Sequence, residues 1–132
     1  VLVDLARMIL NEEPISLDMP AVNLISQLDA NEVALRSFEK SDKQGWIVNA
    51  AGPVWQVRSI VELLGEHLGQ EPQFANSEAS LALLADDSLA TSTFGEYQVS
   101  AHEMIEAAGK WVKNGGEYWN KPTKFGRVAH DY

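Results

Sequence analysis

The residues best suited to hold a ligand stand where two short apolar runs end, at Ser26–Asp29 and Asn49–Gly52. In an open α/β sheet, ligands bind beyond the carboxyl ends of the strands, where carboxylate and amide groups can hold a small polar molecule. Arg58 follows in the first turn of the next predicted helix and could contact an anion. Each residue also has a purely structural interpretation: Asp29 as a helix cap, Asn49 as a turn residue and Arg58 as a surface charge.

The chain lacks the common signatures of catalysis. It contains no glycine-rich dinucleotide fingerprint, no phosphate-binding P-loop, no nucleophile elbow and no cysteine. Its three histidines, His67, His102 and His130, are too far apart in sequence to form a metal-binding pair on one helix. The adjacent carboxylates at 12–13 and 86–87 would point in different directions on a helix, so neither pair forms a focused acid/base site. The sequence therefore predicts no catalytic residue and no metal site.

Hydrophobic spacing predicts helices that alternate with short strands. Helices are expected over Leu2–Ile9, Asp29–Phe38 and Val57–Leu68, between Leu81 and Phe94, and from Ser100 to Val112. Strands are expected at Val22–Ser26 and Trp46–Asn49, with shorter ones at Ile15–Leu17 and Gln73–Phe74. Because the two kinds of element alternate in the first part of the chain, we expect parallel strands joined by right-handed crossovers.

This pattern predicts an α/β fold: a partial Rossmann-like fragment whose short parallel strands alternate with helices, plus a helical C-terminal subdomain. We expect one domain over residues 1–132, with βα units over 1–75, the helical subdomain over 76–116 and a tail over 117–132. Two capping boxes, Asp29–Glu32 and Ser100–Glu103, are expected to begin helices, and Gly69 is expected to end one.

The composition indicates an ordinary globular domain and argues against nucleic-acid and membrane partners. The chain has 132 residues, of which 45% are hydrophobic and 22% charged, as in an ordinary globular domain. Its formal net charge of −9 repels nucleic acid and anionic membranes, so neither is an expected partner. No apolar run is long enough to cross a bilayer. The absence of cysteine fits a reducing compartment, and we expect a cytoplasmic protein.

The first residues already follow helical spacing, without a methionine or a capping residue before them. We therefore expect that the chain was cut from a longer protein. The alternative is a mature or tagged start at which the first helix frays.

Four strings follow one another along the chain: VLVDLARMILNEEPISLDM, NLISQLDANEVALRSF, WIVNAAGPVWQVRSIVELLGEHLGQEPQF and EASLALLADDSLATSTFG. In this order and spacing they resemble the C-terminal portion of extended short-chain dehydrogenases of the NAD-dependent epimerase/dehydratase family. The nearest likeness is to members with a Gln-x-Asp-Ala-Asn segment, which stands here at Gln27–Asn31. The resemblance covers nearly the whole chain and is weakest in the tail.

The resemblance implies that the full-length enzyme binds NAD or NADP through an N-terminal Rossmann segment and acts on a sugar or a sugar-nucleotide-like substrate. The family's catalytic tyrosine and lysine, four positions apart, precede the region that this chain covers. The chain has no such pair, since Tyr118 is followed by Lys121. The expected partners are therefore a small-molecule substrate and the missing Rossmann segment, and the chain alone is expected to bind no cofactor.

The candidate substrate-binding residues are Asn23, Gln27, Asp29, Asn31, Asn49 and Arg58. Many relatives carry an arginine where this chain has Asn23, so a charge-assisted bond to substrate phosphate would be missing. That leaves room for a free sugar, a sugar acid or another hydroxy or keto compound. Two other functions stay open. One is a stand-alone, non-catalytic binding module, and the other is a scaffold whose exposed apolar faces form homo-oligomers.

Overall fold

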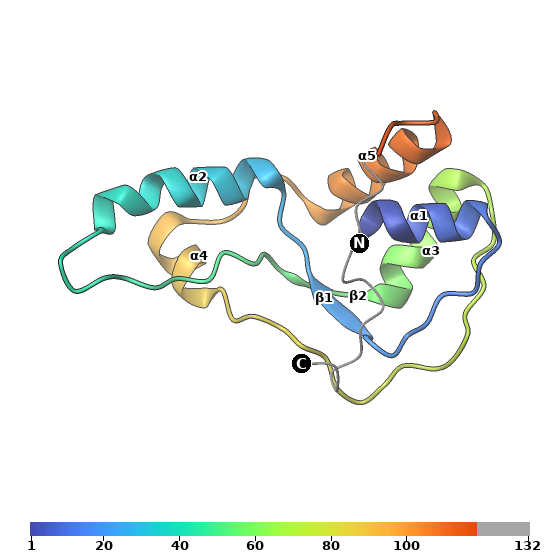
Figure 1. Cartoon of the computed structure of the whole chain (residues 1–132), viewed down its shortest axis with the longest axis horizontal. Coiled ribbons are helices and arrows are strands. Elements are labelled where there is room, and N and C mark those ends of the chain that lie inside the picture. Colours follow the sequence, from blue (N-terminus) through green and yellow to red (C-terminus); the bar gives the residue numbers. More distant parts are fainter. Residues whose placement is uncertain (119–132) are drawn as a thin grey trace.

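A computed structural model describes residues 1–118, and residues 119–132, most of the predicted tail, lie outside the described part of the chain. The elements follow in the order α1 (Leu2–Leu10), β1 (Ala21–Asn23), α2 (Gln27–Ser37), the 3₁₀ turn η1 (Phe38–Lys40), β2 (Val54–Gln56), α3 (Val57–Leu68), α4 (Ser88–Phe94) and α5 (Ala101–Lys113) (Figure 1). The fold is mixed α/β and consists mostly of helices.

Three helices, α1, α3 and α5, pack on one another and enclose the main hydrophobic core (Figure 1). Apolar residues recur every three or four positions in these helices, which gives each of them one apolar face. Leu5, Ile60, Leu64 and Ile105 from these faces are fully buried. Each side chain of this size contributes about 1.5–3 kcal/mol by leaving water, so the packing of these three helices strongly favours the folded state.

A smaller cluster holds α2 against α4. Val33 of α2 and Ala90 and Phe94 of α4 are buried there, and Trp46 packs edge-on against Phe94 with ring centroids 5.8 Å apart. The helical subdomain expected over 76–116 supplies both α4 and α5, but the two helices pack on different partners. α4 lies against α2, whereas α5 lies against α1 and α3 (Figure 1).

The observed helix ends can be compared with the two predicted capping boxes and the predicted C-terminal glycine. The Ser100–Glu103 capping box is confirmed: Ser100 Oγ accepts from the Glu103 N–H, and the Glu103 carboxylate accepts from the Ser100 N–H. Gly69 ends α3 with a positive φ of 73°, as predicted. The helix expected to begin at Asp29 instead begins after the N-cap Ser26, whose Oγ accepts from the Asp29 N–H at 3.0 Å. Ser26 and Asp29 have the same spacing as a capping box, so the true start lies three residues earlier.

The predicted parallel sheet is wrong for the described residues. β1 pairs with β2 in antiparallel register, with Val22 opposite Trp55, and together they form a sheet of two strands. Trp46–Asn49 is extended but pairs with no strand in the described part of the chain. The physical reason lies in its side chains: Trp46 and Val48 pack on the cluster between α2 and α4, so the apolar run is explained by that packing and needs no partner strand.

An isolated parallel bridge is present outside the two-stranded sheet. Ile15 forms an isolated parallel bridge with Phe74, because the Ile15 N–H donates to Gln73 O and the Ala75 N–H donates to Ile15 O, each at 2.9 Å. The two shortest predicted strands, Ile15–Leu17 and Gln73–Phe74, thus contribute one residue each to this bridge. The bridge joins the segment before β1 to the segment after α3.

Residues 76–87 run extended from this bridge to α4, and we call this segment the strap (Figure 1). A helix was predicted from Leu81 onward, but α4 begins only at Ser88. The leucines at 81, 84 and 89 have helical spacing, yet Leu81 is 65% exposed and its two companions are also exposed. The spacing therefore reflects no buried helix face, and the prediction of a longer helix is wrong.

None of the helices within residues 1–118 is both long and apolar enough to cross a membrane.

The turn before β2 depends on Gly52, which has a φ of 78°. A Cβ atom placed there would lie 1.9 Å from the backbone oxygen of Leu24. We predict that Gly52→Ala lowers the free energy of unfolding by about 3 kcal/mol or more, because a backbone clash adds to the cost of a left-handed residue.

The matched control is Gly45→Ala, at a φ of 79° with nothing within 4 Å of the added Cβ atom. This variant should lose only about 1 kcal/mol, the conformational cost alone. Urea unfolding monitored by tryptophan fluorescence measures both. Equal losses for the two variants would show that the close approach of Gly52 to Leu24 is not the constraint.

Candidate functional site

Two of the predicted candidates meet at the end of β1, and both hold the strap. Asn23 Nδ2 donates to Gly52 O at 2.8 Å and to Ala85 O at 3.2 Å, and Asn23 Oδ1 accepts from the Ala85 N–H at 2.9 Å. Asn49 Nδ2 donates to Asp86 O at 3.1 Å. A primary amide carries two donors and an acceptor, which suits it to bind a peptide group or a ligand with alternating hydroxyl and carbonyl oxygens.

A tyrosine and a carboxylate lie beside these amides. Tyr97 is half-buried and its hydroxyl donates to Asp87 Oδ2 at 2.9 Å. Burial and then the nearby Asp87 raise the pKa of Tyr97 to about 12. Asp87 directly follows Asp86, which bonds to Asn49, so the phenol lies beside the strap residues that the two amides contact. We call Asn23, Asn49, Asp87 and Tyr97 together the polar edge.

Asp29 is a buried structural clamp. It is 3% exposed, and its carboxylate accepts from the Ser26 hydroxyl at 2.6 Å and from the backbone N–H groups of Gln98 at 2.8 Å and Val99 at 3.2 Å. These bonds fix the segment before α5 to the start of α2. Burial is the strongest single influence and raises the pKa of Asp29, but the three hydrogen bonds together outweigh it, so the pKa lies below its ordinary value of 3.8.

Arg58 binds Glu78 near the beginning of the strap, away from Asn23 and Asn49. Its Nε donates to Glu78, and its guanidinium lies over the ring of Phe74, 4.2 Å from the centroid. The hydrogen bond to Glu78 raises the pKa of Arg58 and lowers that of Glu78. Close by, Asn76 accepts from the Leu17 N–H at 2.7 Å and donates to Asp18 at 2.7 Å. Arg58 therefore serves as an anchor of the strap and does not join the polar edge.

The remaining two candidates, Gln27 and Asn31, are exposed on α2. Among the described residues, no hydrogen bond joins either side chain to the polar edge. The structure thus brings Asn23 and Asn49 together, while Asp29 bonds to the backbone directly after Tyr97 and none of the other three candidates bonds to these two asparagines.

The sequence did not point to Tyr97 or to Asp87 as members of a site. Asp87 was interpreted as one of two solvated carboxylates on a long helix, but it stands just before α4 and accepts from Tyr97. Its neighbour Asp86 accepts from the Ser88 N–H at 2.9 Å, as residues at helix starts do. The only available signal was the Asp-Asp-Ser sequence, which is typical of a helix N-terminus.

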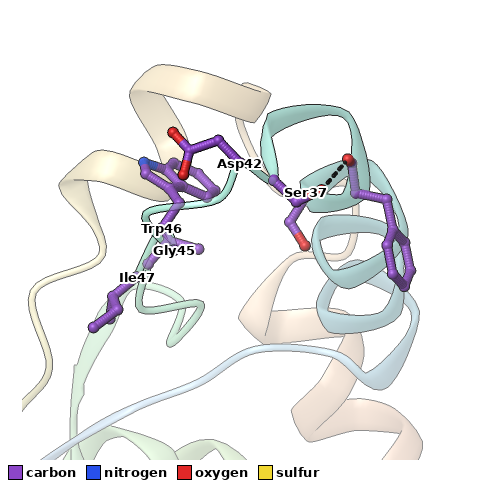
Figure 2. A pocket seen from close by; sticks show the side chains of 8 residues that line it. Ser37, Asp42, Gly45, Trp46 and Ile47 are labelled. Carbon is purple, nitrogen blue, oxygen red and sulfur yellow. Dashed lines mark hydrogen bonds between the residues drawn. The ribbon is translucent and has the colours of Figure 1, made fainter.

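Figure 2 shows an open depression of about 410 Å³ at the end of α2. It is lined by Ser37, Phe38, Ser41, Asp42, Gly45, Trp46, Ile47 and Val48. Its polar groups are engaged in local turns: Ser37 donates to Ala34 O, Ser41 donates to Phe38 O, and Asp42 accepts from the Gln44 N–H. Ile47 is 89% exposed, so the depression offers mainly apolar surface, and none of the six candidates lines it.

Within residues 1–118, histidine and carboxylate side chains form no group of three or more that could hold a metal ion. No model of a known protein family matches the chain, and no curated protein is similar to it in sequence.

The polar edge can recognise a ligand, but its groups are poorly suited to proton transfer. A phenol with a pKa of about 12 stays protonated at neutral pH, and its hydroxyl already donates a hydrogen bond to Asp87. The amides of Asn23 and Asn49 do not titrate. The arrangement therefore supports the binding and orientation of a polar ligand.

We predict that Asp29→Asn lowers the free energy of unfolding by about 2 kcal/mol at pH 7, because the buried amide no longer offers a charged acceptor to two backbone N–H groups. The folded pKa of Asp29 is depressed, so its contribution is present above the unfolded value of about 3.9 and is lost as pH falls through the folded value. The difference between the two proteins should therefore be smaller at pH 3 than at pH 7.

Urea unfolding at both pH values measures this difference. The control is Glu39→Gln, an exposed residue in η1, which should change stability by less than about 0.5 kcal/mol at either pH. A loss in Asp29→Asn that is the same at pH 3 and pH 7 would contradict the proposed role of the ionised carboxylate.

Proposed function

We propose that this chain is the substrate-binding, C-terminal portion of an NAD(P)-dependent epimerase or dehydratase of the extended short-chain dehydrogenase family. In this proposal a separate nucleotide-binding segment holds NAD or NADP and carries the tyrosine and lysine that react. The substrate is a sugar or a related hydroxy or keto compound. The parallel sheet that the sequence suggested is absent from the described residues, so the proposal now rests on the order of the family-like strings and on the polar edge.

The polar edge is the observation that carries the proposal. Asn23 and Asn49 present amide donors and acceptors, and Tyr97 and Asp87 add a phenol and a carboxylate, all at the end of β1. A sugar offers hydroxyl groups that donate and accept around a ring, and a few well-placed polar groups are what orient such a ligand. The chemistry of the edge thus suits a polyhydroxylated compound.

Charge favours a substrate without phosphate at this edge. Arg58, the candidate anion contact, is paired with Glu78. The chain carries a formal net charge of −9, and Asp87 lies within the edge itself. A phosphate brought to this place would meet a negative potential. A neutral sugar, or the sugar part of a larger molecule, is therefore the better match.

A stand-alone binding module is the second candidate, and one observation favours it. The amides of Asn23 and Asn49 are already bonded to the backbone of the strap, as expected for groups with a purely structural role. In that case the chain would present its exposed apolar surface, such as that of Figure 2, to a partner and would have no link to a cofactor.

The proposal predicts that the reading frame continues upstream of Val1 into a nucleotide-binding segment. The protein that includes this segment should bind NAD or NADP in a calorimetric titration, because the resemblance assigns the cofactor to that segment. The 132-residue chain alone should give no heat of binding with either nucleotide, and this titration is the control.

A stop codon directly upstream of Val1 would favour the stand-alone module. A longer protein that folds but binds neither NAD nor NADP would overturn the proposed enzyme class.

A further inference from the structure

The strap is attached to the rest of the molecule in two different ways along its length. At its beginning, Asn76 bonds to Leu17 and Asp18, Glu78 bonds to Arg58, and the Ala79 N–H donates to Leu17 O at 3.1 Å. From residue 80 to residue 86, the hydrogen bonds that the described residues make to other segments all involve side chains of those segments. They join Leu83 N–H to Met19 Sδ, Ala85 to Asn23 and Asp86 to Asn49.

This second half of the strap is also highly exposed. Leu81, Leu83 and Leu84 are 65%, 50% and 45% exposed, so little apolar burial opposes its release. Segments with few buried apolar contacts and exposed hydrogen bonds open locally at a small fraction of the global free energy of unfolding. The core formed by α1, α3 and α5 contains none of these residues and would stay intact when the segment opens.

The groups that hold this half of the strap are the same amides that the proposed function assigns to substrate. Asn23 Nδ2 and Oδ1 bind the carbonyl and the N–H of Ala85, and Asn49 Nδ2 binds the carbonyl of Asp86. These peptide groups stand in chemically for the hydroxyl and carbonyl groups of a sugar, since both offer one donor beside one acceptor.

We propose that residues 80–86 form an autoinhibitory flap that competes with a sugar for Asn23 and Asn49. The inference rests on the proposed function, because it takes the polar edge as the sugar site. Only molecules with the flap open bind the sugar, so the apparent affinity equals the intrinsic affinity reduced by the open fraction. Weakening the flap without altering the two asparagines must therefore tighten sugar binding.

The substitution Ala85→Pro weakens the flap and leaves Asn23 and Asn49 unaltered. Proline lacks the N–H that donates to Asn23 Oδ1, and it is compatible with an extended chain. We expect sugar binding about fivefold tighter than in the unmodified chain, which corresponds to the loss of one neutral hydrogen bond of about 1 kcal/mol. The matched control is Ala82→Pro in the same segment, whose N–H makes no hydrogen bond among the described residues, and its affinity should be unchanged.

The experiment titrates D-glucose, and separately UDP-glucose, into the ¹⁵N-labelled 132-residue chain and follows the amide and side-chain amide resonances of Asn23 and Asn49. Hydrogen exchange at the Leu83 N–H group, which donates to Met19 Sδ, measures flap opening in the same samples, and Ala85→Pro should accelerate it several-fold. Tighter binding of D-glucose or UDP-glucose by Ala85→Pro alone, together with that acceleration, supports competition.

Faster exchange in Ala85→Pro with an unchanged sugar affinity would overturn the competition while leaving the sugar site in place. Unchanged exchange would overturn the flap itself. If neither sugar binds to the unmodified chain or to Ala85→Pro, even though exchange is accelerated, the sugar site of the proposed function fails and the competition fails with it.

Discussion

The side chain of Asn23 joins the strap to the two-stranded sheet, a link that no backbone ladder provides among the described residues. Its amide nitrogen donates to Gly52 before β2 and to Ala85 of the strap, and its amide oxygen accepts from Ala85. In a larger sheet, backbone ladders would satisfy these peptide groups. Here the described sheet has two strands of three residues each, so side-chain amides take over part of that role. The position of the polar edge depends on this one residue.

Local signals predicted α1, α3 and α5 because capping and periodicity are encoded within a few residues, whereas leucine spacing alone wrongly extended α4 back to Leu81. Ser100 and Glu103 begin α5, and Gly69 ends α3, as expected. The error at α2 was one of register, since Ser26 and Asp29 repeat the spacing that Asp29 and Glu32 also have. Strand pairing could not be predicted in the same way, because it depends on contacts distant in sequence. The antiparallel pairing of β1 with β2 brings Gly52 close to Leu24, and no periodicity in the sequence reveals this approach.

The site was predicted in part, and for reasons that can be stated residue by residue. Asn23 and Asn49 do lie at one place, although the parallel sheet that suggested their proximity is absent from the described residues. Both reach the strap, so their shared location arises from residues 85–86 and not from adjacent strand ends. Asp29 was correctly suspected of a structural role, but as a clamp on Gln98 and Val99 and not as the N-cap. Tyr97 was missed because its partner Asp87 was assigned to a helix that begins one residue later.

The balance of charge and protonation at the polar edge limits what it can do under the proposed function. Burial, together with the hydrogen bond that the Tyr97 hydroxyl donates to Asp87, raises the pKa of Tyr97 to about 12 and keeps the phenol neutral below that pH. The two amides and the neutral phenol of this edge can hold hydroxyl groups in a fixed orientation, but they supply neither a strong base nor a hydride acceptor. Holding two reactants in the right relative geometry lowers the free-energy barrier of a bimolecular reaction substantially. The proposed division of labour follows: this chain would orient the sugar, and the nucleotide-binding segment would supply the cofactor and the proton relay.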